Sequence, residues 1–133
     1  METENGQKRF ETSFAVALIG DDGIMQVYFK PTKGIFADDA REFRLNVLGM
    51  TQKSVPVLYD LRESGYVSDE AVDAISDDYA NRMITALAVL VRKPSIWIRL
   101  MALLLTGMKK VKYPLKVFTD KEKALLWLKR YVR

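Results

Sequence analysis

The sequence predicts a single α/β domain in which a mostly parallel, five-stranded mixed sheet packs against four helices. Three observations support this prediction: short apolar runs alternate with amphipathic segments, a Gly-Asp-Asp-Gly turn joins the first two runs, and the chain closes with a strand followed by a capped helix. Alternating strands and helices with short connections are typical of parallel crossovers, and an initial hairpin adds an antiparallel edge. The predicted order is β-β-α-β-α-β-α-β-α.

The chain is predicted to begin with a flexible tail and a hairpin. Residues 1–12 start with a polar, acidic stretch, and we expect them to be a tail that precedes a domain at residues 13–133. Residues 13–19 and 24–29 are apolar runs typical of strands. The four residues between them, 20–23, supply glycines and aspartates that tolerate the positive φ of a tight turn.

The next two elements are predicted to be a helix and a buried strand. Apolar residues with helical spacing predict a helix over residues 37–48: Phe36, Ala40, Phe43 and Val47. Residues 55–59 read Val-Pro-Val-Leu-Tyr, a nearly unbroken apolar run that is typical of a strand covered on both faces. Pro56 lies near the start of this strand, where proline is tolerated.

A second helix, the most apolar strand and a third helix are predicted next. The second helix follows from four apolar residues with helical spacing: Val72, Ile75, Tyr79 and Met83. Ser68 is suited to its N-cap. Residues 87–91 form the most apolar strand, which we expect to be central, and residues 95–106 form a helix that is apolar almost all round. Such a helix is either buried or contacts another molecule.

The closing unit has the clearest boundary in the sequence. Residues 113–118 read as a short buried strand, and Thr119 to Glu122 has the pattern of a capping box. In that motif, the Thr119 hydroxyl accepts from the amide three residues on, while Glu122 reaches back to the Thr119 amide. The apolar face of the last helix then consists of six residues: Ala124, Leu125, Trp127, Leu128, Tyr131 and Val132.

Composition narrows the possible functions. The 133 residues contain no cysteine and no histidine, which excludes thiolate chemistry, histidine-dependent triads and histidine-bound zinc. We therefore expect a protein that is not an enzyme and has no metal or cofactor. The polar N-terminus has no apolar signal segment, and charged residues and a proline interrupt the longest apolar region, residues 84–105. We expect a cytoplasmic protein without a transmembrane segment.

Charge is distributed unevenly along the chain. Residues 1–79 hold 8 basic and 15 acidic side chains, whereas residues 80–133 hold 13 basic and 2 acidic ones. Either the two halves of one fold attract each other, or a basic surface faces an anionic partner. Four lysines between residues 109 and 116, with one tyrosine among them, resemble a nucleic-acid footprint, but no RNA-binding motif accompanies them. We do not expect a nucleic-acid partner.

Two loops beyond the carboxyl ends of predicted strands are candidate sites, because ligands of open α/β sheets bind there. The loop after residues 55–59 offers both charge signs and two hydroxyls before a helix, and five of its residues are candidates for binding a partner: Asp60, Arg62, Ser64, Ser68 and Asp69. A purely structural alternative is that Asp60 and Arg62 pair with each other and that Ser68 only caps a helix.

The second loop follows the most apolar strand. Arg92, Lys93 and Ser95 stand before a helix and could hold an anionic group, with Trp97 and Met101 lining an apolar part of the site. These five residues are the candidate ligand-binding set. The same cations can equally be solvated charges at a strand end. The apolar third helix could be a dimer seam, a partner groove or a lipophilic pocket, or it could be buried against its neighbours.

The element order and two segments resemble the STAS/SEC14-like proteins, which share the fold of the bacterial anti-sigma-factor antagonist SpoIIAA. The segments are Val57 to Arg62 and Phe118 to Leu128, and the resemblance covers residues from about 13 to 133. It is closest to a small stand-alone bacterial branch of uncharacterised proteins. In the antagonists, a serine in an Asp-Ser-Ser-Gly loop is phosphorylated. The matching stretch here is Ser68-Asp69-Glu70-Ala71, so Asp69 stands at the acceptor position.

The resemblance implies a non-catalytic regulatory domain that docks a protein partner or a second copy of itself, without the phosphoserine switch. A binding module for a small apolar or anionic, lipid-like ligand is the alternative; the chain is too short to enclose a whole lipid. An enzyme in which Asp60 and Asp69 share acid/base work is a third possibility, and it requires the two carboxylates to be close together with shifted pKa values.

Overall fold

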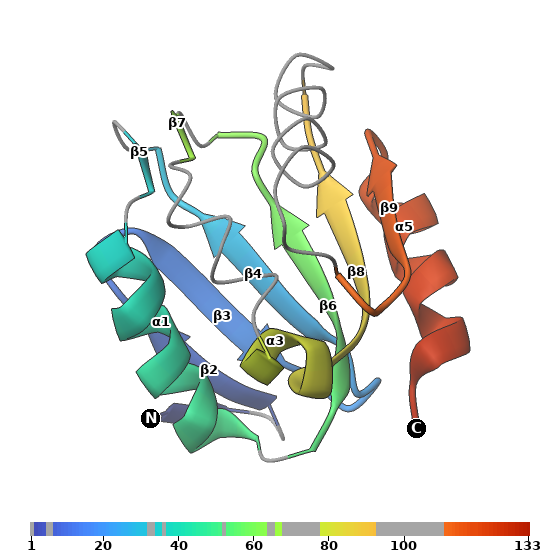
Figure 1. Cartoon of the computed structure of the whole chain (residues 1–133), viewed down its shortest axis with the longest axis horizontal. Helices are drawn as coiled ribbons and strands as arrows, with labels where there is room; N and C mark the ends of the chain where they lie inside the picture. The colour runs from blue at the N-terminus through green and yellow to red at the C-terminus, as the bar shows by residue number, and fades with distance from the viewer. Residues whose placement is uncertain are drawn as a thin grey trace.

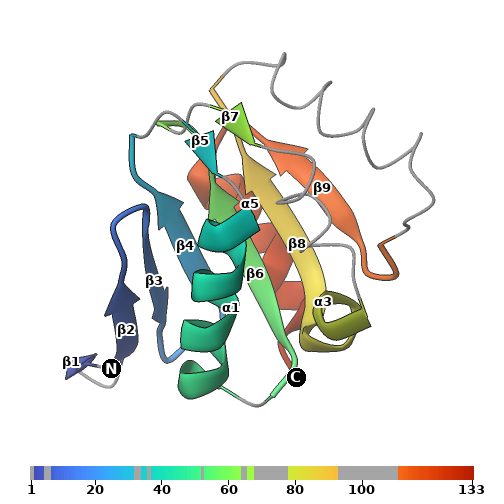
Figure 2. The same cartoon turned by 60° about the vertical axis from the view of Figure 1, so that its left-hand side comes forward.

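The computed structural model describes residues 2–4, 7–31, 34–35, 37–51, 53–63, 66–67, 78–92 and 111–133. They form a seven-stranded sheet with the order β1-β2-β3-β4-β6-β8-β9. Helices α1 and α3 lie on one face of this sheet and α5 lies on the other (Figures 1 and 2). The strands are Glu2–Glu4 (β1), Gln7–Glu11 (β2), Ala15–Ile19 (β3), Met25–Phe29 (β4), Val55–Asp60 (β6), Ile84–Leu90 (β8) and Leu115–Phe118 (β9). The α/β class is therefore as predicted, and the strands of this sheet from residue 13 onward follow the predicted order together with α1, α3 and α5.

The sheet has two more strands than the five predicted. Residues 1–12 were expected to be a flexible tail, and this is wrong for Gln7–Glu11, which pairs antiparallel with β3, and for Glu2–Glu4, which pairs antiparallel with β2. The strand Gln7–Glu11 has one strongly apolar residue, Phe10, and that side chain is only 7% exposed. The other residues of this strand are polar, so the sequence shows no alternation of apolar and polar residues. The strand is instead stabilised by pairing with its neighbours and by this single buried ring.

The strand pairing changes from antiparallel to parallel at β4. Strands β1 to β4 are antiparallel, and β4, β6, β8 and β9 pair in parallel. The register shifts between Val55 and Pro56, which places the proline at an irregularity, where its missing N–H costs least. A separate pair of short parallel strands, Gly34–Ile35 (β5) and Tyr66–Val67 (β7), joins the chain after β4 to the chain after β6. β8 is paired on both sides, with β6 and β9, but it is second from the edge of the sheet and not at its centre as predicted.

Three α-helices lie within the described residues: Ala37–Met50 (α1), Asp78–Met83 (α3) and Lys121–Leu128 (α5), the last followed by a 3-10 turn at Lys129–Tyr131 (η1). The first and last agree with predicted helices, and α3 coincides with the end of the second. The helix predicted over residues 95–106 and the proposed cap at Ser68 lie outside the described residues. No helix among the described residues is long and apolar enough to cross a membrane.

The cap of α5 differs from the prediction by one residue. Asp120, not Thr119, is the N-cap, because its carboxylate accepts from the amides of Glu122 (2.9 Å) and Lys123 (3.2 Å). The capping box predicted from Thr119 to Glu122 is therefore wrong. A carboxylate at this position also favours the positive end of the helix dipole.

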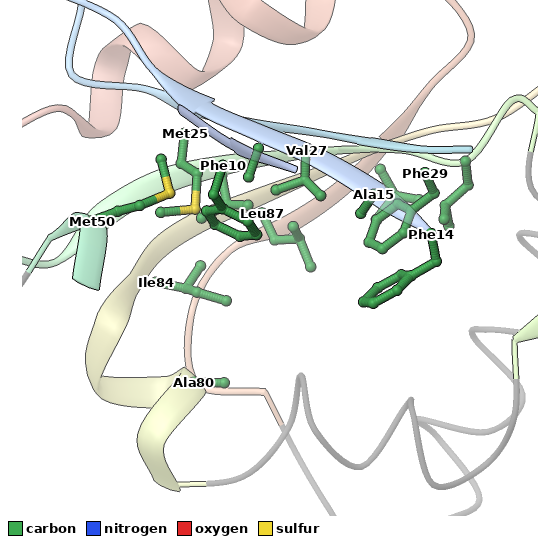
Figure 3. Packing of buried hydrophobic residues seen from close by; sticks show 14 of the residues in the cluster. Phe10, Phe14, Ala15, Met25, Val27, Phe29, Met50, Ala80, Ile84 and Leu87 are labelled. Carbon is green, nitrogen blue, oxygen red and sulfur yellow. The ribbon is translucent and has the colours of Figure 1, made fainter. Parts of the chain in front are cut away.

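One core lies between the sheet and the helices α1 and α3. Figure 3 shows side chains from β2, β3, β4 and β8 together with Met50 of α1, and Ala80 of α3 belongs to the same cluster of buried residues. Met50 is 1% exposed, so α1 is anchored by its last residue. Five aromatic rings contact one another in this core, with centroids 5.4 to 6.5 Å apart in the contacting pairs: Phe10, Phe14, Phe29, Phe43 and Tyr59.

A second core lies on the opposite face and holds α5. It consists of seven buried residues: Ile24, Leu58, Ala86, Ala88, Leu90, Ala124 and Leu128. The alternation of buried residues along β8 explains how one strand serves both cores. Leu87, Val89 and Val91 belong to the first core, whereas the residues between them belong to the second.

The turn between β3 and β4 depends on Gly23, which has φ +78° and is the only described glycine with a positive φ. A Cβ built on Gly23 would lie 3.0 Å from Cγ1 of Val132. We expect Gly23→Ala to lower the free energy of unfolding by about 1–2 kcal/mol, because both backbone strain and a tight contact oppose it. Urea denaturation tests this, with Gly20→Ala as the control in the same turn. Equal midpoints for Gly23→Ala and the wild type would contradict it.

Candidate functional site

Four parallel strands end together at one edge of the sheet, which we call the carboxyl edge. Tyr28 pairs with Asp60, Asp60 pairs with Leu90, and Leu90 pairs with Phe118. Two backbone hydrogen bonds continue the ladder past the strand ends, from the Leu61 amide to the Leu90 carbonyl (2.8 Å) and from the Val91 amide to the Phe118 carbonyl (3.0 Å). The residues that follow β6 and β8 are therefore held side by side.

Asp60 and Arg62 form a two-pronged ion pair at this edge. The Arg62 Nε donates to Asp60 Oδ1 (3.0 Å), and the Arg62 Nη2 donates to Asp60 Oδ2 (2.9 Å). The Arg62 amide also donates to Asp60 Oδ1 (3.1 Å). Two parallel charge-assisted bonds fix the plane of the guanidinium, which a single contact would leave free to rotate.

The two members of this pair differ in exposure. The Asp60 side chain is 9% exposed, whereas the Arg62 side chain is 36% exposed. The hydrogen bond with the Asp60 carboxylate raises the pKa of Arg62 above its ordinary value, with a smaller opposing contribution from burial. Asp60 and Arg62 therefore pair with each other, as the purely structural alternative proposed, and part of the Arg62 side chain stays exposed to solvent.

Glu63 and Arg92 form a second ion pair across the two neighbouring strand ends. Arg92 Nη2 donates to Glu63 Oε1, and these residues are 29 positions apart in the sequence. The Arg92 side chain is 61% exposed and the Glu63 side chain is 40% exposed. An exposed pair of this kind contributes little to stability. It does place one negative and one positive charge beside Arg62.

The edge is suited to recognising charge. Arg62, Glu63 and Arg92 are at least partly exposed, and each is tied to a strand end by pairing or by an ion pair. Charges held in this way can complement a charged surface without a large loss of side-chain entropy. Within the described residues, no group of three or more acidic side chains could hold a metal ion.

The structure brings together part of each predicted residue set. Asp60 and Arg62 of the partner-binding set are in direct contact, and Arg92 of the ligand-binding set lies at the neighbouring strand end. The other candidates lie outside the described residues: Ser64, Ser68, Asp69, Lys93, Ser95, Trp97 and Met101. Their roles remain predictions.

The sequence analysis did not identify two residues of this edge. Glu63 was not among the candidates, yet it pairs with Arg92. Tyr28 is opposite Asp60 in the register and is 38% exposed. Tyr28 could have been identified from the sequence, because successive side chains of a strand point to opposite faces. Tyr28 therefore lies on the opposite face from the buried Val27 and Phe29.

Comparison with known proteins identifies the fold. The structure is similar to that of an uncharacterised protein of the DUF3478 family with a SpoIIAA-like fold from Shewanella loihica PV-4. The two chains are 16% identical, the match covers 96% of this chain and 98% of the other, and the TM-score is 0.52. This likeness confirms the SpoIIAA-like fold that the resemblance implied. The model of a domain of unknown function, DUF7793, matches residues 18–132. No curated protein matches the chain.

Proposed function

This chain belongs to the DUF7793 family, a domain of unknown function, and we propose that it is a non-catalytic regulatory domain that docks a protein partner at its carboxyl edge. The observation that supports this most is the arrangement of Arg62, Glu63 and Arg92. Three charges of alternating sign lie at adjacent strand ends, and a buried carboxylate orients the first of them. Such an arrangement suits a partner surface with the opposite order of charges.

The ion pair between Glu63 and Arg92 favours protein docking over binding of a small anionic ligand. Arg92 is the described member of the proposed head-group site, and Glu63 already occupies one of its nitrogens. An anion at Arg92 would have to displace this carboxylate or accept its repulsion. A protein surface can contact both members of the pair at once, so the pair itself becomes part of the recognised pattern.

We propose that docking does not require a phosphoserine switch. In the alignment with the SpoIIAA-type antagonists, Asp69 takes the place of the phosphorylated serine. A carboxylate cannot be phosphorylated by a serine kinase. Regulation would then come from the concentration of the partner and from competition for the edge, and the salt dependence of binding would reflect the exposed charges.

Exchange of the two charges tests the docking edge. The double variant Glu63→Arg/Arg92→Glu keeps an ion pair within the chain but reverses its direction. We expect this variant to fold with wild-type stability. Its affinity for the partner should fall at least about tenfold, because each exchanged charge would then face a group of like charge on the partner. Bait capture from the native host with quantification by mass spectrometry identifies the partner, and light scattering across a dilution series detects a second copy. Titration calorimetry then measures the affinity.

A matched control distinguishes the edge from overall charge. Arg92→Glu and Arg130→Glu change the net charge equally. Arg130 is an exposed residue of η1, and η1 lies at the opposite end of β8, where the Tyr131 carbonyl accepts from the Thr85 hydroxyl (3.0 Å). Arg92→Glu is expected to weaken the complex, whereas Arg130→Glu is not. Equal binding by the wild type and the charge-exchanged variant would exclude the edge. A strict monomer that captures nothing would remove the proposed function altogether.

A further inference from the structure

β9 is the outermost described strand on its side of the sheet (Figure 2), and its Phe118 ring contacts Trp127 of α5. A strand in this position can hydrogen-bond to an additional strand from another chain. We propose that this flank, formed by β9 and the adjacent side of α5, is a second docking site that takes an extended acidic segment of a partner protein as an added strand. The proposal does not depend on the carboxyl edge.

The backbone of β9 offers two residues for such pairing. The carbonyls of Pro114 and Phe118 accept from the amides of Leu87 and Val91 in β8. In a parallel pair, the residues that face the neighbouring strand alternate with residues that face the other way. The amides and carbonyls of Leu115 and Val117 therefore point away from β8, toward the outer side of the sheet. Four main-chain groups are thus arranged for an added strand.

A row of aromatic rings runs beside this strand. Phe118, Trp127 and Tyr131 are half-buried, with ring centroids 5.7 Å apart for the first pair and 5.1 Å apart for the second. The rings lie along the same side of β9 as α5, so alternate side chains of an added strand would contact them. Half-exposed aromatic rings provide large contact areas with little loss of conformational entropy.

Charge determines which kind of strand fits. Lys116 is exposed, and its ammonium lies 5.4 Å from the centroid of the Phe118 ring, which holds it beside the edge. Lys123 is exposed and precedes Trp127 by one helical turn, on the same side of α5. Residues 111–133 carry seven basic and two acidic side chains. A segment with acidic residues at alternate positions would face these lysines.

Lys116 also disfavours a second copy of this chain as the source of the added strand. Antiparallel pairing of two β9 strands would bring two Lys116 side chains toward each other, and facing like charges destabilise a strand pair. Pro114, at the start of the strand, further limits how far such a pair can extend. Edge lysines and prolines of this kind discourage self-association. An acidic segment removes the repulsion and so is favoured over a copy.

Amide exchange with a synthetic peptide tests this flank. The probe is fluorescein-labelled Gly-Glu-Val-Glu-Val-Glu-Gly with blocked ends, added to the full chain up to about 1 mM, where weak peptide complexes are detectable. We expect the amides of Leu115 and Val117 to exchange more slowly when the peptide is bound. We also expect Lys116→Glu to weaken the peptide about fivefold by fluorescence polarisation, since one exposed attraction becomes a repulsion. Lys129→Glu changes the net charge equally at an exposed residue of η1, just after α5, so it serves as the control and should bind normally.

Four further results decide the outcome. A peptide N-methylated on the amides that face β9 should not bind, whereas methylation of the alternate amides should leave binding intact. No protection of Leu115 and Val117 at the highest peptide concentration would overturn the proposal, as would equal binding of a peptide with lysine in place of glutamate. Single-stranded DNA and anionic vesicles are tested in the absence of the peptide. If either binds, and if Lys116→Glu and Lys129→Glu weaken that binding equally, this flank is a general basic surface, and the proposal is overturned.

Discussion

Leu128→Ala is expected to lower the free energy of unfolding by about 2–5 kcal/mol, which is the usual cost of truncating a buried leucine. Leu128 has 0% exposure and belongs to the core that holds α5 against β6 and β8. Its truncation removes contacts with that core and leaves a cavity that the sheet cannot close. Because α5 follows β9 directly, we also expect the amides of β9 to exchange faster in this variant.

The matched control is two residues away. Leu126 lies on the same helix and is 67% exposed, so Leu126→Ala should change the free energy of unfolding by less than about 0.5 kcal/mol. Urea denaturation monitored by circular dichroism measures both variants. If the two substitutions have equal effects, α5 does not pack as described, and the second core would have to be abandoned.

Asp60→Ala is expected to lower the free energy of unfolding by about 1–3 kcal/mol. The buried carboxylate accepts both a backbone amide and the two-pronged bond from Arg62, and alanine accepts neither. The cost stays at this level because the Arg62 side chain is 36% exposed and can turn toward water. Partner binding should also weaken, since Arg62 loses its fixed orientation.

A double-mutant cycle separates these contributions. Chemical denaturation of Asp60→Ala, Arg62→Ala and the double variant should give a coupling energy of at least about 1 kcal/mol between the two side chains. Additive effects would show that the pair seen at the carboxyl edge has no energetic importance. The docking role of Arg62 would then lack its structural basis.

Sequence patterns predicted the elements whose burial is regular. β8 was predicted from an unbroken apolar run, and α5 from apolar residues with helical spacing. Gln7–Glu11 could not be found in this way, because its pattern is polar and its position depends on pairing with β3. The cap of α5 was misplaced because Thr119 and Asp120 can both accept from helix amides, and only the backbone conformation decides between them.

The candidate site was predictable to a similar extent. Asp60 and Arg62 are two residues apart at the end of a strand, so their pairing could be proposed from the sequence. The ion pair between Glu63 and Arg92 could not, because it depends on the parallel register that places Asp60 beside Leu90. A shift of this register would separate the two charges. Long-range pairs of this kind become visible only when the strand order is known.

Hydrogen–deuterium exchange on the complex with the captured partner would show where docking occurs. We predict protection in segments that contain residues 60–63 and 91–92, with no change in residues 129–131 at the opposite end of the sheet. Protection that spares both strand ends and falls elsewhere on the molecule would contradict docking at the carboxyl edge.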